Sequence, residues 1–430
     1  MAVSPWTPTV RVLAGLTGPI IDPSVWQIGD AARGKIGTAA IGADEVWADI
    51  TYAVQSWTFR RGAAREDIGL RYEAGTGTVV LNNGNRDFDP TNLAGPFVSG
   101  GITTLLPMVQ VRIVAEWAGV AEVLVTGYAD SWTPDFSDPT WSVTTLQFTD
   151  GFKPLASVDR TPQTPVGGSE LSGARVDRIL TSVGWSSEDR DLAAGDTTMQ
   201  ATTLGGNALD ELLLTQDSEL GELYMDAMGR VVFRNRRAVL FDVRSTTSQV
   251  TFGDAGVAAG EVPYRSTQIG NDTTTLANLV TITRAGGAAQ VAEDVTSQLQ
   301  YLLKTYTNPT PLIVEIDGEA LNIAQWLLSQ NKDPELRFSA VTLGLPTPGN
   351  AATVWPLVLA RELGDRVTVV RRPPGGGDPI ERDVFIRGIE HFSDGVDWTV
   401  TFSFQSAAKY QFWTIEHPTL GRVGLNALAF

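Results

Sequence analysis

One pattern constrains this chain more than any other: an alternation of apolar and polar residues that occurs twice, in residues 109–148 and again in residues 367–404. In each copy two alternating runs flank a turn and a third run follows a loop, which predicts a hairpin and a further antiparallel strand. Two positions match between the copies: Gly127 with Gly388 at the end of the second run, and Trp141 with Trp398 at the start of the third. The two offsets, 261 and 257 residues, nearly agree. We interpret the pattern as duplication of one β-domain, with chance convergence of generic strand patterns as the alternative.

The third run of each copy predicts how its side chains are buried. Trp398, Val400 and Phe402 alternate with polar residues, so this strand is expected to bury one face. The run 141–148 is less regular, because its apolar residues change face midway, and a β-bulge is one explanation. Trp141 and Trp398 both lie in apolar registers, and we expect both in the core.

Between the two β regions the apolar spacing changes to three, four and seven residues, which predicts helices. Ser172 and Asn207 are each expected to cap one, and residues 221–233 read as a tight hairpin. At 430 residues the chain exceeds what one core usually serves. We divide it into a first β domain (1–155), a small α/β domain (156–240), a second β domain (241–410) with a helix-containing insertion at about 296–345, and a C-terminal docking tail (411–430).

Composition excludes several classes of function. The formal charge is -17 with a pI near 4.6, so general attraction to nucleic acid or anionic lipid is not expected. There is no cysteine, which removes disulfides, thiolate zinc sites and cysteine nucleophiles. No uninterrupted run of about 18 apolar residues occurs, so no membrane span is expected.

Signatures of catalysis are scarce. Only His391 and His417 could serve as histidine bases, and neither a serine nucleophile elbow nor a phosphate-binding Walker loop is present. Asp130, Asp135 and Asp138 lie close in sequence, and a pair of carboxylates is what a glycosidase needs. In so acidic a chain a solvated loop is the favoured interpretation. We therefore expect no enzyme activity, no catalytic residue and no cofactor.

One turn offers oxygen atoms at alternate positions, as calcium prefers: Asn83, Asn85, Asp87 and Asp89. It lacks the downstream bidentate glutamate of an EF-hand loop. Because Asn, Asp, Gly and Pro also build turns by bonding their own backbone, a structural turn is favoured and no metal site is predicted.

Several stretches resemble the minor tail proteins of long-tailed phages that infect actinobacteria. They are the runs 47–51, 56–62, 74–83 and 88–96, the helices and hairpin expected at 172–234, and later 362–367, 386–391 and the tryptophan at 398, so that most of residues 5–410 is covered. The positions that we take as structural markers of this family are Trp47, Asp49, Thr51, Arg60, Gly62, Leu81, Asn82, Phe88, Asp89, Pro90, Asn92, Gly127, Trp141, Gly388 and Trp398.

The resemblance implies a β-rich α+β fold with two tube-type antiparallel β-barrel domains and α/β insertions. It further implies a virion protein at the tail tip: a hub that closes a ring as a homotrimer, continues the tail tube and forms part of the DNA channel. The expected partners are the distal tail protein, the tape measure protein and other tip or fibre proteins, with DNA present only in transit. The alternative is a peripheral tail protein that binds a receptor or carbohydrate, and a tail-associated glycosidase ranks third.

Overall fold

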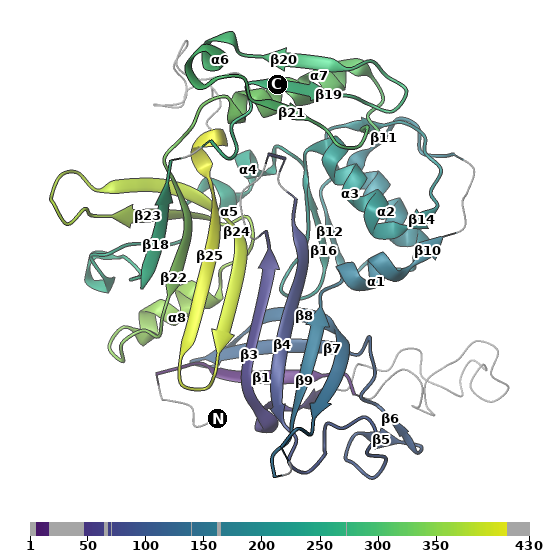
Figure 1. Ribbon diagram of the computed structural model, residues 1–430, viewed down its shortest axis with the longest axis vertical. Coiled ribbons are helices and arrows are strands. Elements are labelled where there is room, and N and C mark those ends of the chain that lie inside the picture. The colour runs from purple at the N-terminus through teal and green to yellow at the C-terminus, as the bar shows by residue number, and fades with distance from the viewer. Residues whose placement is uncertain are drawn as a thin grey trace.

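The structure is a computed structural model that describes residues 6–16, 47–63, 68, 69, 71–138, 140–160, 165–271 and 273–410. It is β-rich with helices, and its centre is one 13-stranded sheet flanked at one end by two smaller α/β units (Figure 1). Two regions of that sheet correspond to the two β regions of the sequence, and we call them the N-module and the C-module. The expected docking tail, 411–430, lies outside the described residues.

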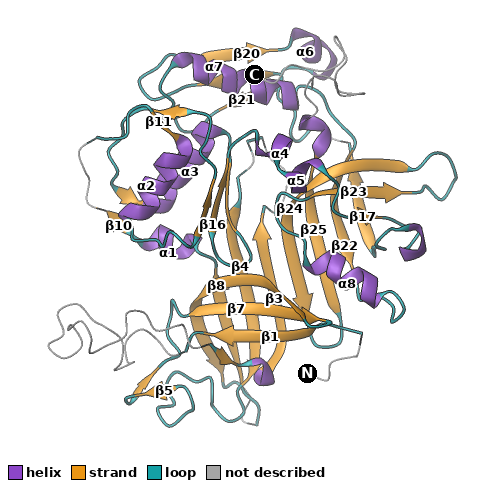
Figure 2. Ribbon diagram, turned by 180° about the vertical axis from the view of Figure 1, so that it is seen from behind, coloured by secondary structure: helices purple, strands orange, loops and turns teal. Residues whose placement is uncertain are grey.

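The N-module contains six strands that pair in the order β3-β4-β9-β8-β7-β1. Their bounds are β1 Thr9–Ala14, β3 Val54–Gly62, β4 Glu73–Asn82, β7 Gln110–Trp117, β8 Val120–Asp135 and β9 Val143–Thr149. The sheet curls strongly, so that β1, β7 and the first half of β8 cross β3, β4 and β9 at a large angle (Figures 1 and 2). The short strand β2 (Ala48–Asp49) pairs with β1, and β5 (Val98–Ser99) and β6 (Ile102–Thr103) form a separate hairpin.

The C-module contains six strands in the order β18-β22-β25-β24-β23-β17. Their bounds are β17 Thr251–Phe252, β18 Ser266–Gly270, β22 Arg337–Leu343, β23 Arg366–Arg371, β24 Ile380–Ser393 and β25 Trp398–Ser406. Helix α8 (Ala351–Leu359) packs its apolar side into the core that both modules share. Among the described residues no strand pairing closes either module into a barrel, so the tube-type barrels stay a prediction.

The two modules repeat one plan. Strands β1, β3, β4, β7, β8 and β9 correspond in chain order and in pairing order to β17, β18, β22, β23, β24 and β25. A register shift interrupts β8 between Ala129 and Ser131 and interrupts β24 between Ile386 and Gly388. One difference remains, because β1 runs antiparallel to β7 whereas β17 runs parallel to β23. The shared plan supports duplication over chance convergence.

The bulges correct the alignment that we drew from sequence. The extra residues are Asp130 and Arg387, whose offset of 257 equals that of the two tryptophans. Gly127 and Gly388 are therefore not equivalent, since Gly388 aligns with Ser131. Both glycines lie inside long strands rather than at strand ends.

Trp398 is buried as predicted, but the prediction for Trp141 is wrong: it precedes β9 and is 52% exposed. Strand β9 keeps Thr144, Leu146 and Phe148 inward without a break in its pairing to β4, and the bulge lies in the neighbouring strand β8. Trp141 is in step with the residues of β9 that face outward. The short, irregular apolar pattern of this run does not show which residues face outward.

The first α/β unit has its own core beneath three helices. The helices are α1 Phe152–Ser157, α2 Ser172–Ser182 and α3 Ala208–Glu219, and the strands are β10 Asp159–Arg160, β11 Glu170–Leu171, β12 Arg190–Leu192, β13 Thr198–Met199, β14 Gly206–Asn207, β15 Glu222–Met225 and β16 Val231–Arg234. The predicted hairpin is confirmed as β15–β16. Asn207 caps α3 as predicted, accepting from two amides, whereas Ser172 is no cap, because its hydroxyl bonds Glu219 instead.

The second α/β unit is inserted in the C-module and has a separate core. It consists of β19 Leu279–Ile282, β20 Gln290–Glu293, α6 Val295–Tyr301, β21 Thr305–Thr307 and α7 Asp317–Asn331. The unit thus begins and ends earlier than the range of about 296–345 that we expected, because β19 and β20 belong to it and β22 returns to the large sheet. Two short helices, α4 (Ala238–Phe241) and α5 (Val243–Thr246), lie between the first unit and β17.

Candidate functional site

The feature that unites this molecule is the seam between its modules, where strand β3 pairs with strand β24. The pairing is antiparallel and runs from Gly62 opposite Gly388 to Trp57 opposite Ser393. Strand β24 reaches two partners on this side, because its first half pairs with β23 and its second half, after the bulge, pairs with β3. The seam therefore makes one continuous sheet out of two repeated modules (Figure 2).

Two glycines allow the backbones to approach at the start of the seam. Gly62 has φ +89°, and a Cβ placed on it would lie 2.3 Å from the main-chain oxygen of Arg387. A Cβ on Gly388 would lie 2.4 Å from the main-chain oxygen of Ala63, whose amide donates to Arg387 at 2.7 Å. Real side chains do not tolerate such distances, so both positions require glycine. These two family-marker residues thus meet in space.

An aromatic cluster covers the other end of the seam. Phe59 on β3 stacks on His391 of β24 with ring centroids 4.9 Å apart, and Trp57 meets Trp398 edge-on at 5.2 Å. The indole N–H of Trp398 donates to Nδ1 of His391 at 3.2 Å. His391 is therefore a buried strand residue whose Nδ1 already accepts a hydrogen bond.

Acidification is expected to weaken the fold through this histidine. Burial, with Arg61 nearby, lowers the pKa of His391 to about 3. The unfolded chain takes up a proton near pH 6.5, so stability present above that pH is lost as the pH falls, by about 1.4 kcal/mol per unit. Between pH 7 and pH 5 we expect wild type to lose about 2 kcal/mol relative to a His391→Phe variant, measured by urea unfolding.

The comparison with His391→Phe isolates the histidine from other groups. Asp150 is also buried, and burial raises its pKa to about 6, which changes stability in the opposite direction over part of this range. Because Asp150 is present in both proteins, its contribution cancels in the difference. Parallel pH profiles for the two proteins would show that His391 does not titrate as its surroundings indicate.

Arg387, the bulged residue of β24, ties the seam to the first α/β unit. Its buried guanidinium donates to Gln405 at 2.9 Å and to the Tyr72 hydroxyl at 3.0 Å, and lies 2.7 Å from the Glu222 carboxylate of β15. Burial alone would lower the pKa of Arg387, but Glu222 and Tyr72 outweigh burial and hold the pKa above its usual value. The charge is thus retained in the core because it is paired.

A second ion pair crosses the seam. Arg61 of β3 is almost fully buried and contacts Glu362 at 2.8 Å, in the segment before β23. Glu362 also accepts from the amide of Ala227, in the β15–β16 turn, at 3.3 Å. Sequence reasoning missed both networks. The one signal in the sequence was Arg387 itself, a charged residue inside an otherwise apolar strand run.

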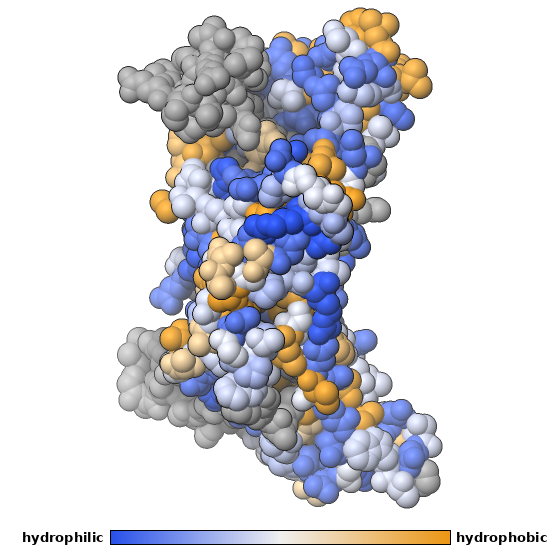
Figure 3. Space-filling model, turned by 90° about the vertical axis from the view of Figure 1, so that its left-hand side faces the viewer, coloured by the Kyte–Doolittle hydropathy of each residue, from blue (hydrophilic) through white to orange (hydrophobic). Residues whose placement is uncertain are grey.

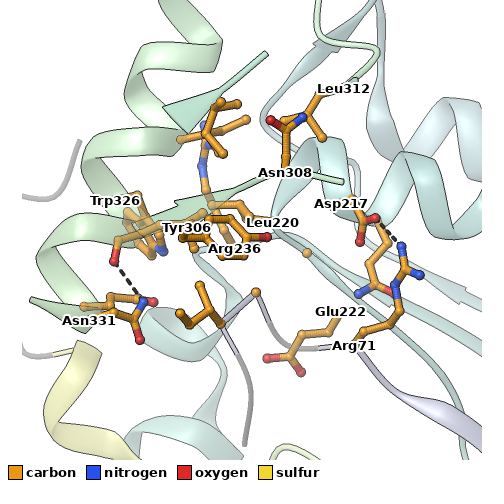
Figure 4. Close-up of a pocket in the computed structure, with 18 of the residues that line it drawn as sticks. Arg71, Asp217, Leu220, Glu222, Arg236, Tyr306, Asn308, Leu312, Trp326 and Asn331 are labelled. Atoms are coloured by element: carbon orange, nitrogen blue, oxygen red, sulfur yellow. Dashed lines mark hydrogen bonds and ion pairs between the residues drawn. The ribbon is translucent and has the colours of Figure 1, made fainter. Parts of the chain in front are cut away.

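A cavity of about 310 Å³ lies where the N-module meets the two α/β units (Figure 4). Its lining includes Arg71, Asp217, Glu222, Arg236 and Trp326. Arg71 pairs with Asp217, Arg236 approaches Glu319 at 3.7 Å, and Glu222 is held by Arg387. The pairs Arg71–Asp217 and Arg387–Glu222 link the β-sheet to the first α/β unit at this cavity.

The N-terminal marker residues hold β1 and the segment after it in place. Trp47 lies under the guanidinium of Arg112, 4.6 Å from its ring centroid. Asp49 contacts Arg11 at 3.1 Å and accepts from the amide of Thr51 at 3.0 Å, and the Thr51 hydroxyl accepts from the main chain of β1. These contacts attach the residues around Asp49 to β1 and to Arg112 of β7.

The remaining markers build strands and turns. Arg60 pairs with Glu73 at 2.6 Å between neighbouring strands. Leu81 and Phe88 are fully buried, and Asn82 accepts from Gly84 within its own turn. Pro90 is half-buried, the Asn92 amide donates to the main chain of Arg86, and a Cβ on Gly127 would meet Phe148 at 2.8 Å.

The turn that resembles a calcium loop uses its oxygens to hold itself together. Asn83 accepts from the amide of Phe88 at 2.9 Å, and Asp89 accepts from Arg86 and Thr91. Asn85 is exposed and Asp87 half-buried. These contacts favour turn building over cation binding. Within the described ranges no cluster of three His, Cys, Asp or Glu side chains is arranged to hold a metal.

The three aspartates considered for glycoside hydrolysis do not form a matched pair. Asp130 is engaged by Lys153 and Thr149. The backbone amides of Ser137 and Thr140 hold the pKa of Asp135 and Asp138 below the usual range. A glycosidase acid has a raised pKa, which is opposite to the shift at Asp135 and Asp138.

Comparison with solved structures identifies the fold. A 43 kDa tail protein of prophage MuSo2 from Shewanella oneidensis superposes with a TM-score of 0.54 over 94% of this chain and 98% of its own, at 13% identity. A tail protein from Neisseria meningitidis MC58 gives 0.54 over 84% of this chain and 94% of its own, at 14% identity. The chain has the fold of these tail proteins.

The sequence matches no protein-family model and no curated protein. The two tail proteins described above come from Shewanella and Neisseria, so the resemblance to actinobacterial phages in particular stays a prediction. In the part of the chain that the structure describes, no helix is long and apolar enough to cross a membrane.

Proposed function

We propose that this chain is a structural, non-catalytic protein of a phage tail tip: a hub subunit that closes a ring as a homotrimer and continues the tail tube. One observation carries the proposal, namely that a chain with the tail-protein fold joins two modules of equal strand order into one sheet. Each chain then supplies two of six similar positions, and three copies close a ring without free edges.

The hub contacts other tail proteins above and below the ring. We propose the distal tail protein and the tape measure protein on the tube side, and tip or fibre proteins on the other. Each module closes into a tube-type barrel only within such a ring. The net charge of -17 suits a channel through which DNA passes without sticking, and we expect part of the acidic excess to face the lumen.

The position of the protein on the virion tests the proposal. Cryo-electron microscopy of tails, with the chain located by antibody or fused tag, is expected to show three copies around the tail axis at its tip. Copies placed off the axis, or in any number other than three around it, would contradict the hub.

A peripheral role in recognising the cell surface is the second candidate. Phe136 and Trp141, on either side of the β8–β9 turn, are 53% and 52% exposed, and exposed aromatic rings can stack on sugars. Binding of the purified chain to a glycan array would favour this candidate. A hub is expected to bind none of the glycans.

A further inference from the structure

We infer that strand β18, the free edge of the C-module, pairs with the second half of β8 in a neighbouring copy of this chain. The register is the one that joins β3 to β24 within a single chain. The inference rests on the proposed function for the number of copies, and it adds the segments and residues that meet.

The first step is that β8 has an unoccupied position equivalent to the seam. In the C-module, Ile386 exchanges two backbone hydrogen bonds with Gly364 and Asp365, and β24 then bulges and pairs with β3. In the N-module, Ala129 exchanges the same two bonds with Met108 and Val109, and β8 then bulges at the matching place.

Beyond the bulge the two modules differ in whether another strand pairs with the long strand on this side. The second half of β24 is covered by β3, whereas the second half of β8, from Ser131 to Asp135, pairs only with β9 among the described strands. The edge of β8 in the N-module is therefore open at the position that matches the edge of β24 where β3 pairs.

The second step is that β18 corresponds to β3 and, among the described strands, has no partner on its outer side. Strand β18 pairs with β22 and with no other described strand. Ile269 lies opposite Phe338 of β22, as Phe59 lies opposite Gly77 of β4. Ile269 thus occupies the position of Phe59.

Combining the two steps gives the register. In the seam Phe59 lies opposite His391 and Arg60 lies opposite Glu390. With the offset of 257 set by the bulges, the first pair becomes Ile269 opposite Pro134. The second pair becomes Gly270 opposite Thr133 of the neighbouring copy.

The exposed residues of these edges fit a self-contact. Ile269 is 38% exposed and Phe136, just after β8, is 53% exposed, so both offer apolar surface beside the strands. The side of the molecule drawn at the left of Figure 1 is mostly hydrophilic with small separate hydrophobic patches (Figure 3). Main-chain pairing between strand edges, supported by small apolar contacts, suits such surfaces better than broad apolar burial.

The seam between copies is expected to be weaker than the seam within one chain. Pro134 has no N–H, so the neighbouring strand receives one donor fewer than at the matching His391. Strand β18 is also shorter than β3. A monomer can therefore fold first and assemble afterwards.

Disulfide trapping tests the register, because the wild-type chain has no cysteine. In the double variant Thr133→Cys/Gly270→Cys the two thiols of adjacent copies would be about 5 Å apart at Cα, which allows a disulfide. Oxidation of the purified full-length chain is expected to give a covalently closed trimer on a non-reducing gel. Each single variant should remain uncrosslinked.

A matched control shifts the partner along the same strand. In Thr133→Cys/Ser266→Cys the second thiol lies four residues from Gly270, roughly 13 Å away, beyond disulfide reach. Crosslinking of the control but not of the test pair would overturn the register. A chain that sediments as a trimer without crosslinking at the test pair would overturn the strand pairing and leave the hub intact, and a chain that stays monomeric at high concentration would also overturn the pairing.

A charge on the edge gives an independent test of the contact. Ile269→Lys is expected to weaken trimer formation about tenfold or more in sedimentation equilibrium, because the contact would bury an unpaired ammonium. Val291→Lys is the control, since Val291 is 52% exposed on β20, an edge strand of the second α/β unit. Equal assembly of the two variants would contradict the proposed contact, whatever the location of the protein on the virion.

Discussion

Replacing Gly62 by alanine is expected to destabilise the protein by about 3 kcal/mol or more, measured by the urea midpoint. The added methyl group would lie 2.3 Å from the main-chain oxygen of Arg387, and the φ of +89° is unfavourable for any L-residue. The contact is with backbone on the neighbouring module, so relief requires β3 and β24 to move apart.

Gly119→Ala separates the two causes. Gly119 has φ +83° in the β7–β8 turn, and a Cβ there would meet nothing within 4 Å. That variant is expected to show only the conformational penalty of about 1 kcal/mol. If Gly62→Ala were no worse than Gly119→Ala, the close approach at the seam would not matter. We also expect Gly62→Ala to increase proteolysis at the junction of the modules.

Removing the buried charge at the bulge is the second large effect that we expect. Arg387→Met keeps much of the side-chain length but leaves the Glu222 carboxylate buried without its partner. Breaking one side of a buried ion pair typically costs about 3–5 kcal/mol, so the urea midpoint should fall sharply.

Two further variants show whether pairing is the cause. Adding Glu222→Gln to Arg387→Met is expected to recover part of the loss, because the orphaned charge is removed. Arg60→Met is the surface control: Arg60 contacts Glu73 at 2.6 Å with both side chains exposed to solvent, and its removal should change the midpoint far less. Equal losses for Arg387→Met and Arg60→Met would contradict the role of burial.

The sequence predicted those features that are local. The alternation of apolar and polar residues placed Trp398, Val400 and Phe402 correctly in the core, because the buried and exposed faces of one strand can be read from that strand alone. The hairpin at β15–β16 and the cap at Asn207 also depend on a few adjacent residues. Recognition of two related β regions followed from comparing such patterns.

Contacts between distant segments could not be predicted in the same way. Gly62 and Gly388 were both selected as markers, yet nothing in their surroundings indicates that they face each other. Arg387 was overlooked because a bulge turns it inward, and a bulge shifts the register without leaving a mark on composition. Trp141 was misplaced for a related reason, since the start of a strand does not reveal which face its first aromatic residue will take.

The joining of both modules in one polypeptide has a kinetic consequence. The internal seam forms by a unimolecular step, whose extent does not depend on how much protein a cell contains. Contacts between separate chains form by encounter and strengthen with concentration. A ring made of three such chains needs two encounters where six single-module chains would need five, because the last contact of each ring closes within the complex, so fusion removes three of the steps that dilution can oppose.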